Sequence, residues 1–591
     1  MRPTLRVDSQ PGRCAGRSCS GPDCGARRRV CMTSHNTFLP QMRAARIASL
    51  SNVVHAVHVA VRQHASTHEA SGRASPVAAV ATTGPRIIGA RQLALIILAA
   101  VLTLHSMPAV AKYGWASASY YLLGALVFLV PLSMVVGELG TGWPRAGGSY
   151  AWVREGFGDR QGLFAIWVAW VTNLTWFPVV LSFLAATVAF VIDPSLAENR
   201  IYVVLMVIGV LWVLTFANFL GTRWTLRLNN PAVVVGTLIP CAVLIALAVY
   251  WLCSGRHSQI PFTAGKLVPD LSSIGALVFF VGVILGYTGV EAAGYYSREV
   301  QEPKRDYPRA IAVATVLIVG ASILATLAIA LVVPHSKLSL VAGIPQAFTE
   351  IFRQIGAVWA GKLMSALVAI GTLALVSTWV LAPSKGLYAT ERAADLPPWL
   401  HRVNRRHVPV ALLLVQGVLS TVFALLYLIA PSVNTSFWML TALTTQMLLL
   451  MYILIFAAAI KLRYSQPDVE RSYKVPGGTA GMWLVAGIGI AGCLFSFALG
   501  FIPPSEVKHW PTPIYAAVMA VAIVLMSLPP FIVERIKKPS WMEPHPDPVL
   551  LDATPASTPD ESKPAAAGEA ASRPAGTPAE RAIDDAAAGQ P

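Results

Sequence analysis

The chain has 591 residues, of which 55% are hydrophobic and only 13% are charged. Soluble proteins carry about 25% charged residues, so this chain has more apolar surface than a soluble domain can bury. Its formal net charge is +16, but the basic residues lie between apolar runs, which is typical of a membrane protein facing anionic lipid rather than of a nucleic-acid binder.

An N-terminal extension, residues 1–85, is rich in Arg, Ser and His. We expect it to be disordered and cytoplasmic, with a targeting peptide and an upstream start codon as alternatives. Four cysteines and a histidine in it raise the question of a metal cluster, but their spacings differ from the usual zinc pairs, so we expect no metal and no cofactor. They are Cys14, Cys19, Cys24, Cys31 and His35.

Apolar runs long enough to cross a hydrocarbon core about 30 Å thick follow the extension. They predict an all-α integral membrane domain of about 12 transmembrane helices at residues 86–538, with a short surface helix at Pro345–Gln354. The acidic, Ala/Pro-rich segment 539–591 cannot bury enough apolar area to fold alone, so we expect a disordered cytoplasmic tail. The expected spans are Gln92–Lys112, Ser117–Gly140, Gly162–Val191, Arg200–Leu220, Asn230–Leu252, Ser273–Ser297, Pro308–Val333, Gly356–Ala382, Val408–Ile429, Ser436–Leu462, Met482–Phe501 and Thr512–Val533.

Lysine and arginine are distributed unevenly between alternate connections of these spans. If the N-terminus is cytoplasmic, the inner connections hold 21 of them and the outer connections hold 8. The positive-inside rule therefore predicts a multi-pass protein of the cell membrane with both termini in the cytoplasm.

The first span is interrupted near its middle by Thr103, His105, Ser106 and Pro108. Proline lacks an N–H and clashes with the preceding turn, so it begins a half-helix better than it continues a whole one. Backbone groups freed by such a break cannot face lipid, and must line a cavity or bind a ligand. A proline kink satisfied by neighbouring helices is the simpler alternative.

The sixth span is weakened by Gly282, Gly286 and Gly289, and it carries Glu291 deep in an apolar run. A charge at that depth costs roughly 3 kcal/mol on insertion scales, so an acid there needs a specific reason. We interpret Glu291 as a candidate proton carrier or gate. The alternative is a neutral, hydrogen-bonded carboxyl group that only packs between helices.

These two spans each begin a set of five helices. Broken first helices in two successive sets of five are the pattern of a LeuT-like 5+5 inverted-repeat transporter, whose site lies at mid-membrane between the breaks. The N–H groups at one break suit a carboxylate and the carbonyl groups at the other suit an ammonium, so the pattern predicts a zwitterionic substrate. The sequence contains no P-loop, HExxH or nucleophile-elbow motif, so neither ATP-driven transport nor an enzyme is indicated.

Three motifs resemble the amino acid–polyamine–organocation (APC) transporters, in the order in which that family has them. They are ELGTGWPRAGGSYAWVREGFG at 138–158, GYTGVEAAGYYSREVQEPKRDYPRAI at 286–311 and PSKGLYATERAADLPPWLHRVNRRHVPV at 383–410, and the resemblance covers about residues 88–535. Within the family, residues 104–144 and 167–183 look like the glutamate/GABA antiporter branch. The usual glycine-serine-glycine break is replaced here by Leu104–Pro108, and that branch also lacks the standard glycines.

The resemblance implies that the substrate touches both breaks, and that Glu291 corresponds to an acidic residue of related exchangers. The implied substrate-binding residues are Thr103, Leu104, His105, Ser106, Met107, Gly286, Tyr287, Thr288, Gly289 and Val290.

Further candidates lie outside the breaks. We expect Trp176 to line the substrate pathway and Glu138 to be structural. The remaining candidates are Asn173, Trp379 and Trp438 for the pathway, and Glu299, Lys304 and Arg305 for a cytoplasmic salt-bridge cluster, which a solvated loop would explain equally well.

We therefore expect a secondary active transporter that moves acidic or neutral amino acids of the glutamate/GABA kind by alternating access. The expected partners are an amino acid and the lipid bilayer, without nucleic acid; proton coupling, antiport or symport, and monomer or homodimer stay open. A basic amino acid or polyamine exchanger is the runner-up, disfavoured because Glu291 is the one acid visible at the breaks. A non-transporting amino acid sensor on the same fold is the alternative from another class.

Overall fold

The computed structural model describes residues 88–143, 148–221, 231–232, 234–269, 277–291, 300–388, 397–406, 408–504 and 511–536. Within these ranges the chain is almost entirely helical; it contains two isolated β-bridges, Ile88 to Val300 and Val403 to Pro409, and no strand. The extension 1–85 and the tail 539–591 lie outside the described residues, as does Glu299.

Ten helical segments of the described chain are long and apolar enough to cross a membrane, and each falls on a predicted span. The expected all-helical membrane architecture is confirmed. The ends differ by a few residues, most clearly where α16 continues through Pro383 instead of ending at Ala382. In chain order the ten segments are α4 (Ala116–Gly124) with the π-helix η2 (Ala125–Leu129) and α5 (Val130–Gly142); α7 (Asp159–Ile192); α8 (Arg200–Asn218); the π-helix η4 (Val234–Leu238) with α10 (Ile239–Cys253); α14 (Pro303–Val332); α16 (Val358–Tyr388); α17 (Val410–Ala424) with α18 (Leu426–Ile429); α19 (Val433–Ser465); α20 (Gly478–Leu499); and α21 (Thr512–Ser527) with α22 (Pro529–Ile536).

The first predicted span is interrupted. It is divided into α2 (Ala90–Val101) and α3 (Met107–Ala111), and residues 102–106 between them are not helical. Pro108 lies in the first turn of α3, where the N–H that proline lacks would have no partner inside the helix.

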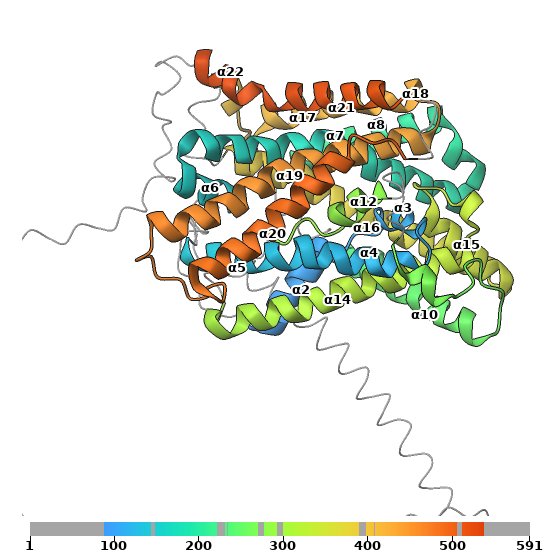
Figure 1. The fold of residues 1–591 in the computed structure, drawn as a ribbon. Helices are drawn as coiled ribbons and strands as arrows, with labels where there is room; N and C mark the ends of the chain where they lie inside the picture. The colour runs from blue at the N-terminus through green and yellow to red at the C-terminus, as the bar shows by residue number, and fades with distance from the viewer. Residues whose placement is uncertain are drawn as a thin grey trace, which may run out of the picture. The chain divides into compact units, whose positions relative to one another are not determined.

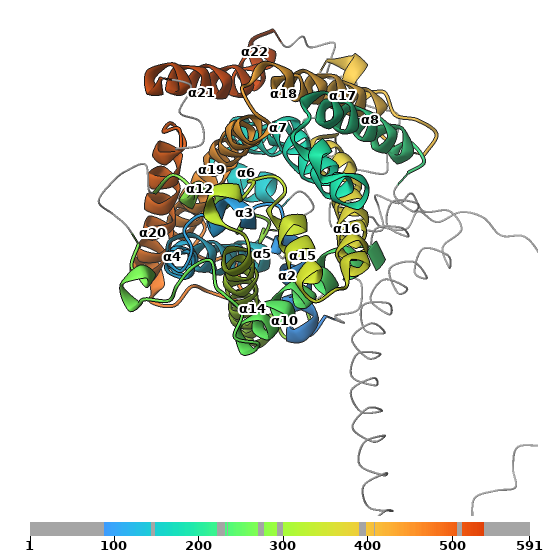
Figure 2. The same cartoon turned by 90° about the vertical axis from the view of Figure 1, so that its right-hand side faces the viewer.

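In its described part, residues 277–291, the sixth predicted span contains a short helix, α12 (Phe280–Leu285), followed by turns at 286–291. The next residues, 292–299, lie outside the described chain. Figures 1 and 2 show α3 and α12 beside each other, with α4, α14 and α19 around them, and these elements are in contact. The two interruptions are thus enclosed by intact helices.

The intact helices divide into a packed interior and an apolar rim. Of the membrane-length window of α7, 78% is buried, because α7 packs against α6 (Ser149–Phe157), α8, α16, α17 and α19. In α21–α22 the buried share is 22%. Large apolar side chains such as Leu205, Phe216 and Leu525 are more than half exposed, as expected for helix surfaces that face lipid tails.

An amphipathic helix, α15 (Gly343–Gln354), lies between α14 and α16. It begins slightly before the predicted surface helix, and its apolar side is buried, with Ile344, Phe348 and Ile351 inaccessible. The segment before it is fixed by Asn434, whose Oδ1 accepts hydrogen bonds from the Leu340 N–H (2.9 Å) and the Ser339 hydroxyl (3.1 Å). Because α15 contacts α3, this helix covers one side of the first interruption. The short 3₁₀ helices of the connections are η3 (Pro194–Glu198), η5 (Ala264–Leu267), η7 (His335–Lys337) and η9 (Pro398–His401).

Near the C-terminal end of α5, the buried carboxylate of Glu138 joins three parts of the chain. Glu138 Oε2 lies 2.6 Å from Arg463 Nη2 at the end of α19, and accepts the Val475 N–H at 2.7 Å. Arg471 Nε lies 3.6 Å from Glu138 Oε1, and Arg471 also donates to the carbonyls of Leu462 and Gln466. We call Glu138, Arg463 and Arg471 the Glu138 cluster. Its bonds agree with the structural role expected for Glu138.

Candidate functional site

The two interruptions touch each other through glycines of the sixth span. Gly286 lies against the Ser106 hydroxyl, and Gly289 lies against the carbonyl oxygen of Ala100. Gly289 has a φ of +105°, and a Cβ added to it would be 3.0 Å from that oxygen. Only glycine combines this backbone conformation with so close an approach without strain. The broken segments are therefore in direct backbone contact.

Glu291 is buried beside this junction. Its Oε2 accepts a hydrogen bond from the Tyr452 hydroxyl of α19 (2.9 Å) and another from the Gly289 N–H (3.1 Å). The same N–H also lies 3.2 Å from the Tyr452 oxygen. The carboxyl group, the tyrosine and the turn thus form a closed triangle that links the second interruption to α19.

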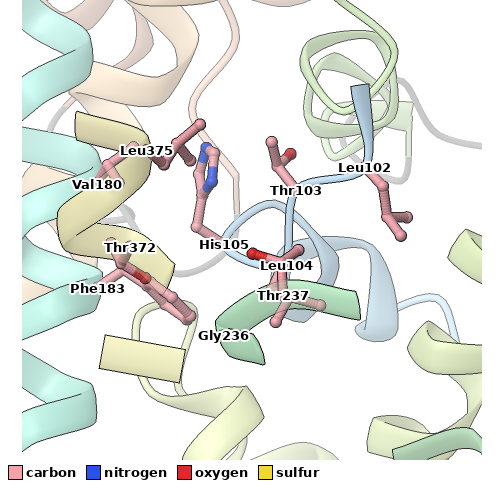
Figure 3. A pocket seen from close by; sticks show the side chains of 10 residues that line it. All are labelled: Leu102, Thr103, Leu104, His105, Val180, Phe183, Gly236, Thr237, Thr372 and Leu375. Carbon is pink, nitrogen blue, oxygen red and sulfur yellow. The ribbon is translucent and has the colours of Figure 1, made fainter. Parts of the chain in front are cut away.

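A cavity of about 20 Å³ is lined in part by residues 102–105 of the first interruption. Figure 3 shows the His105 imidazole in this space, between Thr103 on one side and Val180 and Leu375 on the other. A volume of this size holds about one water molecule, so this cavity does not admit a whole amino acid. The lining residues are Leu102, Thr103, Leu104, His105, Val180, Phe183, Gly236, Thr237, Thr372 and Leu375.

The cavity wall depends on two glycines that bring η4 and α16 together. A Cβ added to Gly236 would lie 2.3 Å from the Cα of Gly371, a separation at which the backbones would have to move apart. Thr237 and Thr372, the next residues along each helix, line the cavity. The π-helical turn η4 places Thr237 there, and such turns are frequent at functional sites.

His105 is 3% exposed, and its Nε2 atom has no hydrogen-bond partner among the described residues. Its ring lies 6.1 Å from the Trp176 ring in an edge-to-face arrangement and 6.4 Å from the Phe183 ring. Trp176 in turn lies 5.8 Å from Trp379. The imidazole therefore has aromatic walls, and its buried Nε2 has no hydrogen bond within the described residues.

The interruption also frees backbone groups. The Met107 N–H bonds to the Leu104 carbonyl and the Ser106 hydroxyl to the Thr103 carbonyl, but the N–H groups of Leu104 and His105 have no partner among the described residues. Unpaired N–H groups ahead of a helix favour a negatively charged ligand group.

Not every sequence candidate faces the cavity or the junction. The Tyr287 side chain is buried and donates to the Tyr121 carbonyl, while Met107 and Val290 belong to the apolar core. Asn173 donates to carbonyls of its own helix, and Trp438 packs on Phe279 at 4.8 Å. Of the expected salt-bridge residues, Arg305 pairs with Glu302 at 3.4 Å. Thr288 donates to the Leu285 carbonyl.

Residues that the sequence did not single out complete the site: Tyr452, Phe183, Thr237 and Thr372. Phe183 ends the run 167–183 noted above, the other three lie outside the quoted motifs, and each is brought in by a helix far away in the chain. Residues 88–525 match the family model for amino acid permeases. The chain belongs to the amino acid permease family. That family consists of membrane transporters and falls within the APC superfamily that the sequence motifs indicated.

Several known proteins resemble this permease. An uncharacterized transporter of Legionella pneumophila is 39% identical over 422 residues, which cover 71% of this chain and 91% of that protein. Glutamate/gamma-aminobutyrate antiporters of Lactococcus lactis subsp. lactis and subsp. cremoris are 31% and 30% identical, each over 74% of this chain and 88% of the antiporter. A crystal structure of MhsT in complex with L-phenylalanine aligns with a TM-score of 0.48 and 15% identity, covering 69% of this chain and 98% of that one.

Proposed function

We propose that this permease is an antiporter of acidic or neutral amino acids, which exchanges glutamate for GABA or a similar pair by alternating access. The contact of the two interruptions, Gly289 on Ala100 and Gly286 on Ser106, carries the proposal. The first interruption contains the N–H groups of Leu104 and His105, which are unpaired among the described residues, and the buried acid Glu291 lies beside the second. The similarity to the Lactococcus antiporters favours this substrate pair among amino acids.

In this proposal the substrate lies between the residues named from the sequence at the two breaks, with Trp176 at the side. The α-carboxylate of a substrate that carries one accepts from the free N–H groups of the first break. Glu291 is the acid that takes up or releases a proton when the exchange is proton-linked, because a carboxylate so deep in an apolar span is costly to keep charged.

The test is counterflow into proteoliposomes that contain the full-length permease and are preloaded with glutamate, GABA, arginine or agmatine, at mildly acidic and mildly alkaline pH. We expect exchange with glutamate and GABA. Exchange with arginine and agmatine alone would replace the proposal by a basic amino acid or polyamine exchanger. Binding without exchange would identify a sensor.

Proton coupling is tested separately with Glu291→Gln in the same vesicles. The amide keeps the size and the hydrogen bond from Tyr452 but does not titrate, so we expect the difference between acidic and alkaline exchange rates to flatten. An unchanged pH profile would limit Glu291 to packing.

We also propose that both termini face the cytoplasm, with 86–538 as the permease domain in the cell membrane. Cys253 is exposed at the end of α10, which this orientation places outside the cell, whereas Cys241 and Cys493 are buried. A membrane-impermeant maleimide should therefore label intact cells, and Cys253→Ser should abolish that labelling. Labelling of intact cells that persists in Cys253→Ser would place the cysteines of the N-terminal extension outside the cell and would invert the orientation.

A further inference from the structure

The first interruption contains a buried polar atom that nothing in the described protein satisfies. His105 Nε2 borders the cavity, and the ring is held by Trp176 and Phe183 rather than by a hydrogen bond. Leaving a buried donor or acceptor unpaired is unfavourable, so such a group in a well-packed region needs an occupant of the cavity.

The surroundings restrict what that occupant is. Val180, Phe183 and Leu375 make the wall apolar, and the lining contains hydroxyl groups but no acid. With no acidic partner, the imidazole offers Nε2 as a single neutral donor or acceptor, depending on its tautomer. A hydrogen bond in such dry surroundings discriminates strongly, because a ligand without the matching group leaves the nitrogen unpaired.

The proposed exchange, on which this inference rests, adds a chemical condition. Glutamate and GABA differ by the α-carboxylate, which the decarboxylated partner lacks. They share an ammonium group and the carboxylate at the far end of the chain. A site that holds both must recognise the shared groups, so the free N–H groups of the first break do not suffice for both substrates.

We propose that His105 is the specificity-determining residue of this permease, and that its Nε2–H donates a hydrogen bond to the distal carboxylate that both substrates share. The aromatic wall of Trp176 and Phe183 positions the ring. The cavity beside Nε2 receives one carboxylate oxygen when the first interruption moves to admit the substrate. Amino acids with an apolar side chain leave Nε2 unpaired and bind weakly.

The experiment compares glutamate, GABA and norvaline as competitors of glutamate counterflow in proteoliposomes of the full-length permease. Norvaline has nearly the size of glutamate but ends in a methyl group. In His105→Leu we expect the preference for glutamate over norvaline to fall by about 10- to 100-fold, through KM more than through the maximal rate. In His105→Gln, whose amide N–H reaches a similar position, we expect most of the preference to return. His335→Leu, at an exposed histidine of η7, is the matched control.

Each outcome decides between the possibilities. Equal losses for glutamate and norvaline in His105→Leu, or an unchanged ratio, would show that the imidazole only packs, and would overturn the inference while exchange by the wild type stands. Failure of the wild type to exchange either substrate would instead refute the proposed function. If His105→Leu is not recovered as folded protein, His105→Gln decides alone: a glutamate preference reduced to that of an unselective carrier overturns the inference.

Discussion

In the Glu138 cluster a buried carboxylate receives an arginine and a backbone N–H, whereas at the first interruption the buried Nε2 of His105 has no partner. Both regions take polar groups out of water. The cluster joins α5 and α19 to the chain beyond α19, and its arginines donate to carbonyls as well as to Glu138. The cavity beside His105 holds about one water molecule and little else.

The difference assigns the two regions different roles: the Glu138 cluster stabilises the fold, and the first interruption takes part in transport. Buried charges that satisfy one another hold helix ends together, and removing one leaves the others exposed to the apolar interior. Unsatisfied groups beside a small cavity lower the stability of the folded state and are available to a ligand. We therefore expect substitutions in the cluster to act on unfolding, and substitutions at the interruptions to act on exchange.

The largest effect is expected for Glu138→Ala. It leaves Arg463 and Arg471 buried without their carboxylate, which costs about 3–5 kcal/mol. The melting temperature of the detergent-solubilised protein, followed by fluorescence-detected size exclusion, should fall sharply. Glu470→Ala, at an exposed acid of the same connection, should leave it unchanged. Equal melting temperatures for Glu138→Ala and Glu470→Ala would show that the Glu138 cluster does not stabilise the fold.

Gly289→Ala should reduce exchange more than it lowers the melting temperature, which is the reverse of what we expect for Glu138→Ala. Its left-handed backbone and the nearby Ala100 oxygen make alanine unfavourable by about 1–3 kcal/mol, less than the loss at Glu138. Exchange should nevertheless be lost, because the junction of the two interruptions opens. Gly320→Ala, in α14 with open space around the Cα, is the matched control and should gain about 1 kcal/mol. Retained exchange in Gly289→Ala would argue that the junction is not the site.

Tyr452→Phe tests the triangle with a smaller change. It removes the hydroxyl that bonds to Glu291 and approaches the Gly289 N–H, a loss of about 1 kcal/mol. We expect a slower exchange rate and a nearly unchanged melting temperature. Tyr464→Phe, also on α19, removes an exposed hydroxyl that bonds to Trp483 of α20 and should change neither. Identical rates for both tyrosine variants would remove Tyr452 from the site.

The smallest effect should come from Glu350→Gln on α15, where Glu350 pairs with Arg353 at 2.7 Å in an exposed position. Exposed pairs contribute about 0–1 kcal/mol. Melting temperature and exchange should both stay within error of the wild type. A clear loss of exchange alone would show that the covering helix α15 takes part in opening the site.

The sequence predicted what depends on local chemistry. Pro108 and the glycines at 286 and 289 weaken a helix locally, and long apolar runs need lipid, so the breaks and the spans could be predicted. The partners were not. Tyr452 meets Glu291 from 161 residues away, and Arg463 meets Glu138 from 325 residues away. Such pairs arise from helix packing, and a single sequence contains no periodicity that records them.

The contact between Gly236 and Gly371 has a consequence for how the substrate specificity of this permease can evolve. The spacing between η4 and α16 beside the cavity follows from the direct approach of these two backbones. Substitutions of the lining side chains can therefore alter the chemistry of the cavity while the spacing of the two helices stays the same. A methyl group added at either glycine would push η4 and α16 apart and would change the cavity for every substrate. We therefore expect these two positions to vary less than the other residues of the site.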